Sequence, residues 1–142
     1  MNTTIKNSLL AVCAGMGSVL AEAVGGWDSF LKALVLFMIA DYITGMTVAL
    51  VFHKSGKTKN GGASSAVGFK GIVKKLCIFF LVALAVRVDL ITGTSYVRNA
   101  TIFIFLGNEG LSVIENIGRM GVKYPAFLKK ALETLKEKNE ET

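Results

Sequence analysis

The sequence is poor in the residue types on which most enzymes and metal sites depend. Its 142 residues include one histidine, two cysteines and one proline. A hydrolase triad needs a histidine beside a nucleophile, and metal sites need several ligands at close spacing, but His53 stands alone. The phosphate-binding pattern G-x-x-x-x-G-K-[ST] is also absent. We therefore expect no enzymatic activity, no cofactor and no metal site.

The two cysteines are too far apart in the chain to indicate a redox or metal-binding pair. Cys13 and Cys77 each lie inside an apolar block. Cysteines in such surroundings usually behave as small hydrophobic residues. We expect both to be buried, reduced thiols.

The charge balance is basic, with 16 lysines and arginines against 10 acidic residues and a net charge of +6. A protein that binds single-stranded nucleic acid would show basic residues interleaved with aromatic ones. Here the cationic residues flank apolar blocks, which is the positive-inside pattern of membrane proteins. The charge therefore indicates a membrane and no nucleic-acid partner.

Apolar residues make up 52% of the chain and are gathered in blocks. A helix needs about 20 such residues to cross a bilayer. We predict an all-α integral membrane protein with three to four transmembrane helices and a soluble, amphipathic C-terminal helix. The transmembrane domain is expected over 1–119 and a charged cytoplasmic tail over 120–142. The expected spans are 8–25, 29–52, 76–92 and 100–118.

The first block leaves the number of spans open. It is short for a full crossing and could instead lie at the membrane surface. It also has some features of a cleavable signal peptide, ending in Ala21-Glu22-Ala23. Small residues line one face of its expected helix and favour close contact with another helix. These helix-contact candidates are Ala11, Ala14, Gly15 and Ser18.

A hydrophilic loop over 53–75 contains lysines, glycines and serines but no acidic residue. Its charge places it in the cytoplasm, where it would contact anionic lipid headgroups. Four spans would then put both termini in the cytoplasm, whereas three would put the N-terminus outside. The lysines that carry this prediction are Lys54, Lys57, Lys59, Lys70, Lys74 and Lys75.

Acidic residues within the apolar blocks are costly in lipid and need a reason. Asp41 and Glu109 are expected at similar depth, so that one would take up a proton or both would line water. Arg87 is expected nearer the outer face, matched to Glu22 or Asp28.

The fourth block also carries a polar stripe along one side of its helix. These polar residues either form interhelical hydrogen bonds only or face the interior of an oligomer. The assembly or pore candidates are Asp41, Thr44, Gly45, Asn108, Glu109, Ser112, Glu115 and Asn116.

Three segments, in order, resemble the toxin-secretion/phage-lysis holin family. The first is Asp41-Tyr42-Ile43-Thr44-Gly45, and the second is the basic loop ending in Gly71-Ile72-Val73-Lys74-Lys75. The third is Asn108-Glu109-Gly110-Leu111-Ser112-Val113-Ile114-Glu115-Asn116, followed by Tyr124-Pro125 and Leu128. The resemblance covers the chain from about Trp27 to Leu132.

The resemblance implies a phage- or prophage-encoded protein of the bacterial inner membrane. Such holins form large homo-oligomers and then open lesions that release or activate an endolysin, without necessarily contacting it. Some relatives export large toxins. Two other functions fit the same hydropathy: a small multi-span exporter, and a membrane adaptor that docks a partner on its tail.

Overall fold

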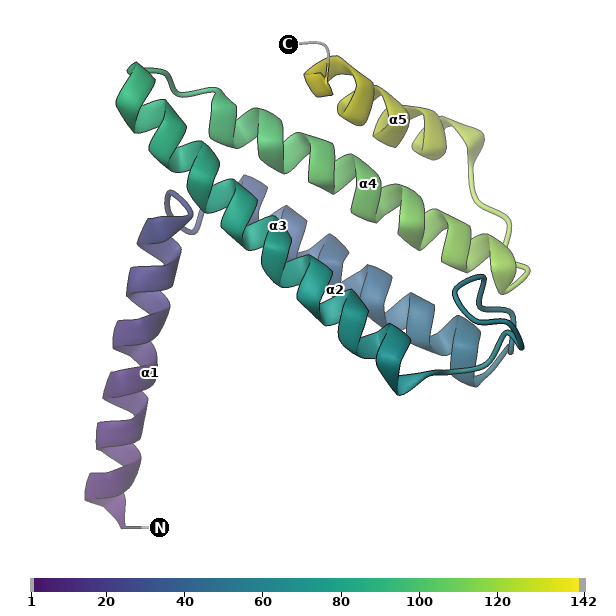
Figure 1. The fold of residues 1–142 in the computed structure, drawn as a ribbon, viewed down its shortest axis with the longest axis horizontal. Coiled ribbons are helices and arrows are strands. Elements are labelled where there is room, and N and C mark those ends of the chain that lie inside the picture. The colour runs from purple at the N-terminus through teal and green to yellow at the C-terminus, as the bar shows by residue number, and fades with distance from the viewer. Residues whose placement is uncertain (1, 141–142) are drawn as a thin grey trace.

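The computed structural model describes residues 2–140 of the chain, with side chains up to residue 137. It contains five helices and, within that range, no strand, which confirms the all-α prediction (Figure 1). The helices are α1 (Thr3–Ala23), α2 (Ser29–Leu50), α3 (Ser65–Thr92), α4 (Val97–Arg119) and α5 (Ala126–Glu140).

Helix α4 lies at the centre of the bundle and packs against α2, α3 and α5. Leu31, Leu34 and Met38 of α2 follow the i, i+3, i+7 spacing that places residues on one helical face. They form a core with Ile78 and Val82 of α3, together with Ile102 of α4 and Val24. This core holds α2, α3 and α4 side by side and so sets the position of the polar residues further along them.

Helix α1 projects away from the bundle (Figure 1). Gly25 and Gly26 have φ values of 82° and 97°, a conformation that favours glycine, and they turn the chain between α1 and α2. The small residues Ala11, Ala14, Gly15 and Ser18 are all exposed. The face predicted to contact another helix therefore has no such partner within the described chain. The large apolar side chains of α1 are exposed as well.

Two helices within residues 2–140, α1 and α2, are long and apolar enough to cross a membrane by length and composition. Helix α3 has 28 residues and α4 has 23, so both also have the length to cross. Their apolar segments are interrupted by charged and polar residues. A count of three or four spans stays a prediction.

Helix α3 begins at Ser65, well before the predicted start of the third span at residue 76. The hydrophilic loop is correspondingly shorter, and Lys70, Lys74 and Lys75 are helical. Gly68 and Gly71 on this first part of α3 lie beside Tyr42, and a Cβ on either would make ordinary contact with it. A Cβ on Gly68 would lie 3.6 Å from the Tyr42 hydroxyl, and one on Gly71 would lie 3.9 Å from its ring.

Helix α5 folds back along α4 and runs antiparallel to it (Figure 1). Its Leu132 is only 6% exposed. The amphipathic C-terminal helix was predicted as part of a charged tail, and the structure gives that helix a packed position on α4. Its cytoplasmic location stays a prediction.

Candidate functional site

The candidate site is centred on Asp41, which lies in the middle of α2 and is only 8% exposed. Helix α2 is capped at its start by Asp28, whose side chain accepts a hydrogen bond from the backbone N–H of Leu31 at 2.9 Å. The core residues Leu34 and Met38 then lie on the side of α2 that faces α4. Asp41 follows Met38 by three residues and lies on the same side of α2, so its carboxylate lies in the interface between α2 and α4.

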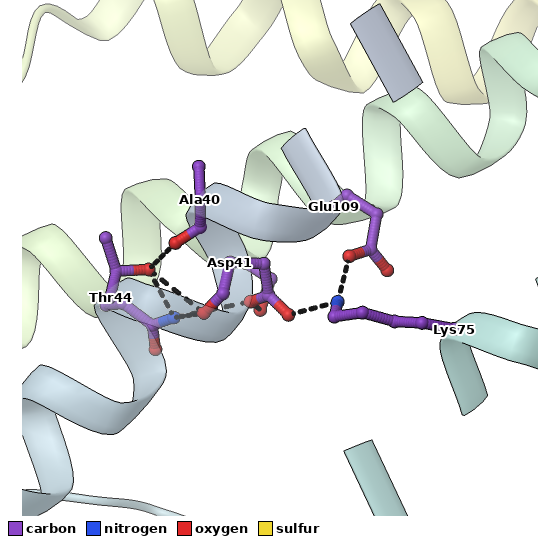
Figure 2. Close-up of polar contacts among 7 residues, drawn as sticks. Ala40, Asp41, Thr44, Lys75 and Glu109 are labelled. Atoms are coloured by element: carbon purple, nitrogen blue, oxygen red, sulfur yellow. Dashed lines mark hydrogen bonds and ion pairs between the residues drawn. The ribbon is translucent and has the colours of Figure 1, made fainter. Parts of the chain in front are cut away.

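Lys75 of α3 connects the two acids of the site (Figure 2). Its ammonium lies 2.8 Å from Asp41 Oδ2 and also forms an ion pair with Glu109 of α4. All three side chains are largely shielded from solvent. A buried charge needs a partner of opposite sign, and one cation here serves two carboxylates.

This arrangement differs from both alternatives predicted for the two acids. We expected either proton uptake by one carboxylate or a water-lined surface, because no cation was assigned to their depth. Lys75 was counted among the headgroup lysines since α3 was expected to begin at Leu76. Lys75 directly precedes an apolar block. If the helix of that block begins several residues earlier, Lys75 becomes part of it and can lie inside the bundle, and this could have been considered from the sequence.

Helix α4 contributes two further polar contacts to Asp41. Ser112 donates a hydrogen bond to Asp41 Oδ1. Asn116 Nδ2 donates to Asp41 Oδ1 at 3.3 Å, to the Asp41 carbonyl at 3.4 Å and to Thr44 Oγ1 at 3.0 Å. Glu109, Ser112 and Asn116 follow helical spacing, so they present one face to α2 and α3.

Thr44 and Gly45 complete the α2 side of the network. The Thr44 hydroxyl donates to the Ala40 carbonyl at 2.8 Å (Figure 2). It also accepts a hydrogen bond from Asn116. A Cβ on Gly45 would lie 3.6 Å from Asn116 Nδ2. The structure thus gathers Asp41, Thr44, Gly45, Glu109, Ser112 and Asn116 in one place, together with Lys75.

Two of the candidates lie outside this network. Asn108 is half-buried and Glu115 is exposed. At about 100° per residue they fall toward the edge of the polar stripe, away from the centre of the face that contacts α2. The stripe is therefore wider than the interface that it forms within one chain.

The loop between α2 and α3 folds over the site. Ser55 N donates to the Gly61 carbonyl at 2.9 Å, and His53 has a φ of 50°. A cavity of about 60 Å³ lies beneath the loop and reaches Asp41 and Lys75. Of the lysines predicted to meet lipid headgroups, those other than Lys75 are exposed: Lys54, Lys57, Lys59, Lys70 and Lys74.

A second polar cluster lies near the opposite end of the bundle, and sequence reasoning missed its centre. Arg98 of α4 is 8% exposed. Its guanidinium donates to Asp28 Oδ2 at 2.6 Å and to the Val24 carbonyl at 2.6 Å. This contact ties the α1–α2 turn to α4. The hydrogen bond from Arg98 also holds the pKa of the Asp28 carboxyl below its usual value.

The partner predicted for Asp28 was wrong. We expected Arg87 to pair with Glu22 or Asp28, but Arg87 is exposed on α3 and Arg98 makes the ion pair with Asp28. Arg98 fell between the spans expected over 76–92 and 100–118, whereas α4 begins at Val97. The Asp89 carboxylate accepts hydrogen bonds from the backbone N–H groups of Val97 and Arg98 at 3.0 and 2.8 Å. This cap begins the helix early enough to include Arg98.

Metal-binding groups and paired cysteines are absent from the described residues. Within them, no group of three or more histidine, cysteine or acidic side chains could hold a metal ion. Cys13 and Cys77 are free thiols, as predicted, but both are exposed. The expectation that they are buried is wrong for the single chain because they lie on outward faces of α1 and α3.

Comparison with known proteins supports the resemblance drawn from the three motifs. Residues 18–137 match the bacteriophage holin family. A probable holin of Bacillus phage phi105 is 32% identical over 117 residues, covering 82% of this chain and 81% of the phage protein. An uncharacterized protein of Listeria innocua is 46% identical over 116 residues, covering 81% of this chain and 77% of that protein.

A third relative, an uncharacterized 14.9 kDa protein of Clostridium perfringens, is 34% identical over 125 residues. The alignment covers 87% of this chain and 89% of that protein. No solved structure matches the chain.

Proposed function

Because the chain belongs to the bacteriophage holin family, we propose that it acts as a holin of the bacterial cytoplasmic membrane. In this role it assembles with other copies of itself and opens lesions that release or activate an endolysin. The family is not an enzyme family, and two apolar helices fit a protein of the inner membrane. Export of a large toxin would use the same lesion for another cargo.

The observation that carries the proposal is the polar network between α2, α3 and α4. Lys75 forms ion pairs with both Asp41 and Glu109 within one chain, and Ser112 and Asn116 donate hydrogen bonds to the other carboxylate oxygen of Asp41. Among the described residues, no buried side-chain nitrogen or oxygen lacks a hydrogen-bond partner. A single chain thus keeps the polar groups of this network away from lipid, which suits a subunit that accumulates without leaking.

Separation of α3 from α2 and α4 would break this network. The cation and the two acids would then need water or polar groups of another subunit, because lipid solvates none of them. Assembled copies could line an aqueous opening with these side chains. In the closed state Lys75, Asp41 and Glu109 would be paired with one another, and in the open state water or another subunit would solvate them.

The outward faces of the helices support a membrane location. Large apolar side chains are exposed along α1, α2 and α3, and an apolar surface of this extent is unusual for a soluble monomer. On α2 and α3 they include Leu36, Ile39, Ile43, Phe80, Leu84, Leu90 and Ile91.

The exporter alternative receives less support from the site. A drug-sized substrate needs a chamber of about 300–1,000 Å³. The cavity beside Asp41 and Lys75 is about 60 Å³, which holds a few water molecules at most. A larger cavity of about 480 Å³ between α1, α2 and α3 is lined by neither Asp41 nor Lys75. The adaptor alternative would leave the intramembrane charges without a role.

Induction in a bacterium, with and without a co-expressed endolysin, tests the proposed function. We expect an abrupt fall in culture turbidity only when both proteins are present, and loss of viability with the chain alone. Unchanged turbidity and viability at a verified membrane level of the protein would refute the proposal. Resistance to a cationic drug under the same induction would instead support an exporter.

A further inference from the structure

The contact between α4 and α5 is built on a groove that only glycine allows. Gly107 and Gly110 of α4 are both buried beneath α5. A Cβ on Gly107 would lie 2.9 Å from the Leu132 carbonyl oxygen and 3.1 Å from the Lys136 Cβ. A Cβ on Gly110 would lie 2.7 Å from the Leu132 side chain. The backbone of α5 therefore sits directly on α4, as helices do over small-residue faces.

Within the described residues, helix α5 packs mainly against α4. It has 15 residues, a length at which an isolated helix is marginal in water. Leu132 is its only buried residue among those whose side chains are described, while Phe127 is 75% exposed. Lys129 and Glu133 pair with each other on the exposed side of the helix. Its position thus depends largely on the glycine groove, and the contact can form only where such a groove is present.

The connection between α4 and α5, residues 120–125, is held by local hydrogen bonds. Gly121, with a φ of 87°, donates to the Gly118 carbonyl, and Val122 N donates to the Ile117 carbonyl. Most of these six residues are exposed. Extended, they would reach about 20 Å. Packed helices lie about 8–10 Å apart, so this hinge is long enough to carry α5 to the groove of an adjacent chain.

We propose that α5 exchanges between copies of this chain, so that α5 of one copy docks on the Gly107–Gly110 groove of the next. The occupant is specified by the structure, because every copy carries the same groove and the same complementary helix. Docking within one chain and docking between two chains bury the same pair of surfaces. The balance between the two therefore depends on the hinge and on the local concentration of chains. This inference rests on the proposed assembly in the membrane.

One-way exchange has a consequence for the size of the assembly. A row of copies leaves one groove unused at one end and one α5 unused at the other, so it keeps growing unless it closes into a ring. In either docking, Lys136 of α5 stays against the groove. If α4 spans the membrane, Lys136 lies beside Gly107 near its middle, where lipid would be a poor environment for a charge.

Photo-crosslinking between two differently tagged copies tests the exchange. One copy carries a diazirine analogue of lysine in place of Lys136 and the other carries none. Both are expressed together with the endolysin and irradiated in membranes before lysis. We expect adducts between the two tags, with the linked peptide of the second copy containing Gly107. A copy with the photoreactive group at the exposed Phe127 serves as the control and should not give this peptide.

Changing the hinge length provides a second measurement that leaves both contact surfaces intact. Insertion of six Gly/Ser residues after Val122 should favour docking on the same chain and lower the yield of adducts between copies. Deletion of Val122 and Lys123 should raise it, because short hinges favour exchange. Adducts confined to the same chain at all three hinge lengths would overturn the proposal.

Lysis of the same cultures separates this inference from the proposed function. Lysis without adducts between copies would refute the exchange and leave the holin assignment standing. Adducts between copies without lysis would support the exchange and count against the holin assignment.

Discussion

At the scale of single residues, the site depends on how one cation is shared. Lys75 forms ion pairs with both Asp41 and Glu109, and it reaches them from a third helix. Replacement of one member of a buried charge group leaves the others without compensation. The three residues therefore act as a unit, and their substitutions should not have additive effects.

Lys75→Met tests this unit. The change leaves Asp41 and Glu109 as neighbouring carboxylates in a poorly solvated interface, and we expect a loss of about 3–5 kcal/mol in the free energy of unfolding. Thermal unfolding in detergent, followed by helical circular dichroism, measures it. Lys74→Met is the matched control, since Lys74 is exposed on the same helix, and it should change stability by about 0.5 kcal/mol or less.

Adding Asp41→Asn to Lys75→Met should recover part of that loss, because one uncompensated charge is then removed. A double variant as unstable as the sum of the two single variants would show that the three residues do not act together.

The Asp28–Arg98 pair predicts a dependence on pH. Arg98 lowers the folded pKa of Asp28, so the pair stabilises the fold above the unfolded pKa of about 3.9, and this contribution is lost as the pH falls through the folded pKa. Asp28→Asn should therefore lower the unfolding midpoint at pH 6, and the difference from the native protein should shrink toward pH 2.5. A difference that is constant over this range would contradict the assignment.

At the scale of helices, small residues have different roles according to what lies against them. The glycines of α3 leave room beside the Tyr42 ring, those of α4 admit the backbone of α5, and Gly15 of α1 contacts nothing within 4 Å. Alanine stabilises an exposed helix relative to glycine by about 1 kcal/mol. A glycine-to-alanine substitution should therefore raise stability where the space beside the glycine is open, and lower it where another segment fills that space.

Gly107→Ala should destabilise the docking of α5, because the new Cβ meets a backbone oxygen that cannot rotate away. Overpacking of this kind costs about 1–3 kcal/mol. Trypsin cleavage after Lys129 and Lys130 measures the release of α5, and we expect faster cleavage in the variant. Gly71→Ala is the control, since its Cβ would make ordinary contact with Tyr42 at 3.9 Å. Equal cleavage rates for the two variants would contradict the packing described for α5.

At the scale of the whole molecule, an extended apolar helix and a compact bundle are joined by a short turn. Helix α1 is exposed throughout most of its length, whereas α4 is enclosed by three other helices. The same molecule thus contains one element that needs lipid or another chain and a bundle that satisfies its own polar groups. The side of the membrane on which each end lies follows from how many helices cross.

Four spans would place both termini and the basic loop in the cytoplasm, and labelling of single cysteines tests this. In a variant that lacks Cys13 and Cys77, Lys57→Cys should be protected from a membrane-impermeant maleimide in intact cells, whereas Ser95→Cys should react. Asn2→Cys should be protected if α1 crosses the membrane. Reaction of Asn2→Cys together with protection of Lys57→Cys would establish three spans.

Local features of the sequence predicted much of the fold. The second span was expected over 29–52 and α2 covers Ser29–Leu50, and the fourth was expected over 100–118 where α4 covers Val97–Arg119. Apolar periodicity and polar punctuation act over a few residues, so they can be read without a tertiary structure. The start of α3 was harder to predict because the lysines, glycines and serines before residue 76 are also typical of a loop.

The sequence by itself determined that the chain is helical, largely apolar and a member of the holin family, because composition, periodicity and ordered motifs are properties of the chain alone. It also identified most of the polar residues of the site. Only the tertiary structure decided which charges meet: Lys75 is 34 residues from both Asp41 and Glu109, and Arg98 is 70 residues from Asp28. Such pairs depend on how helices pack, and no local pattern specifies a partner on another helix.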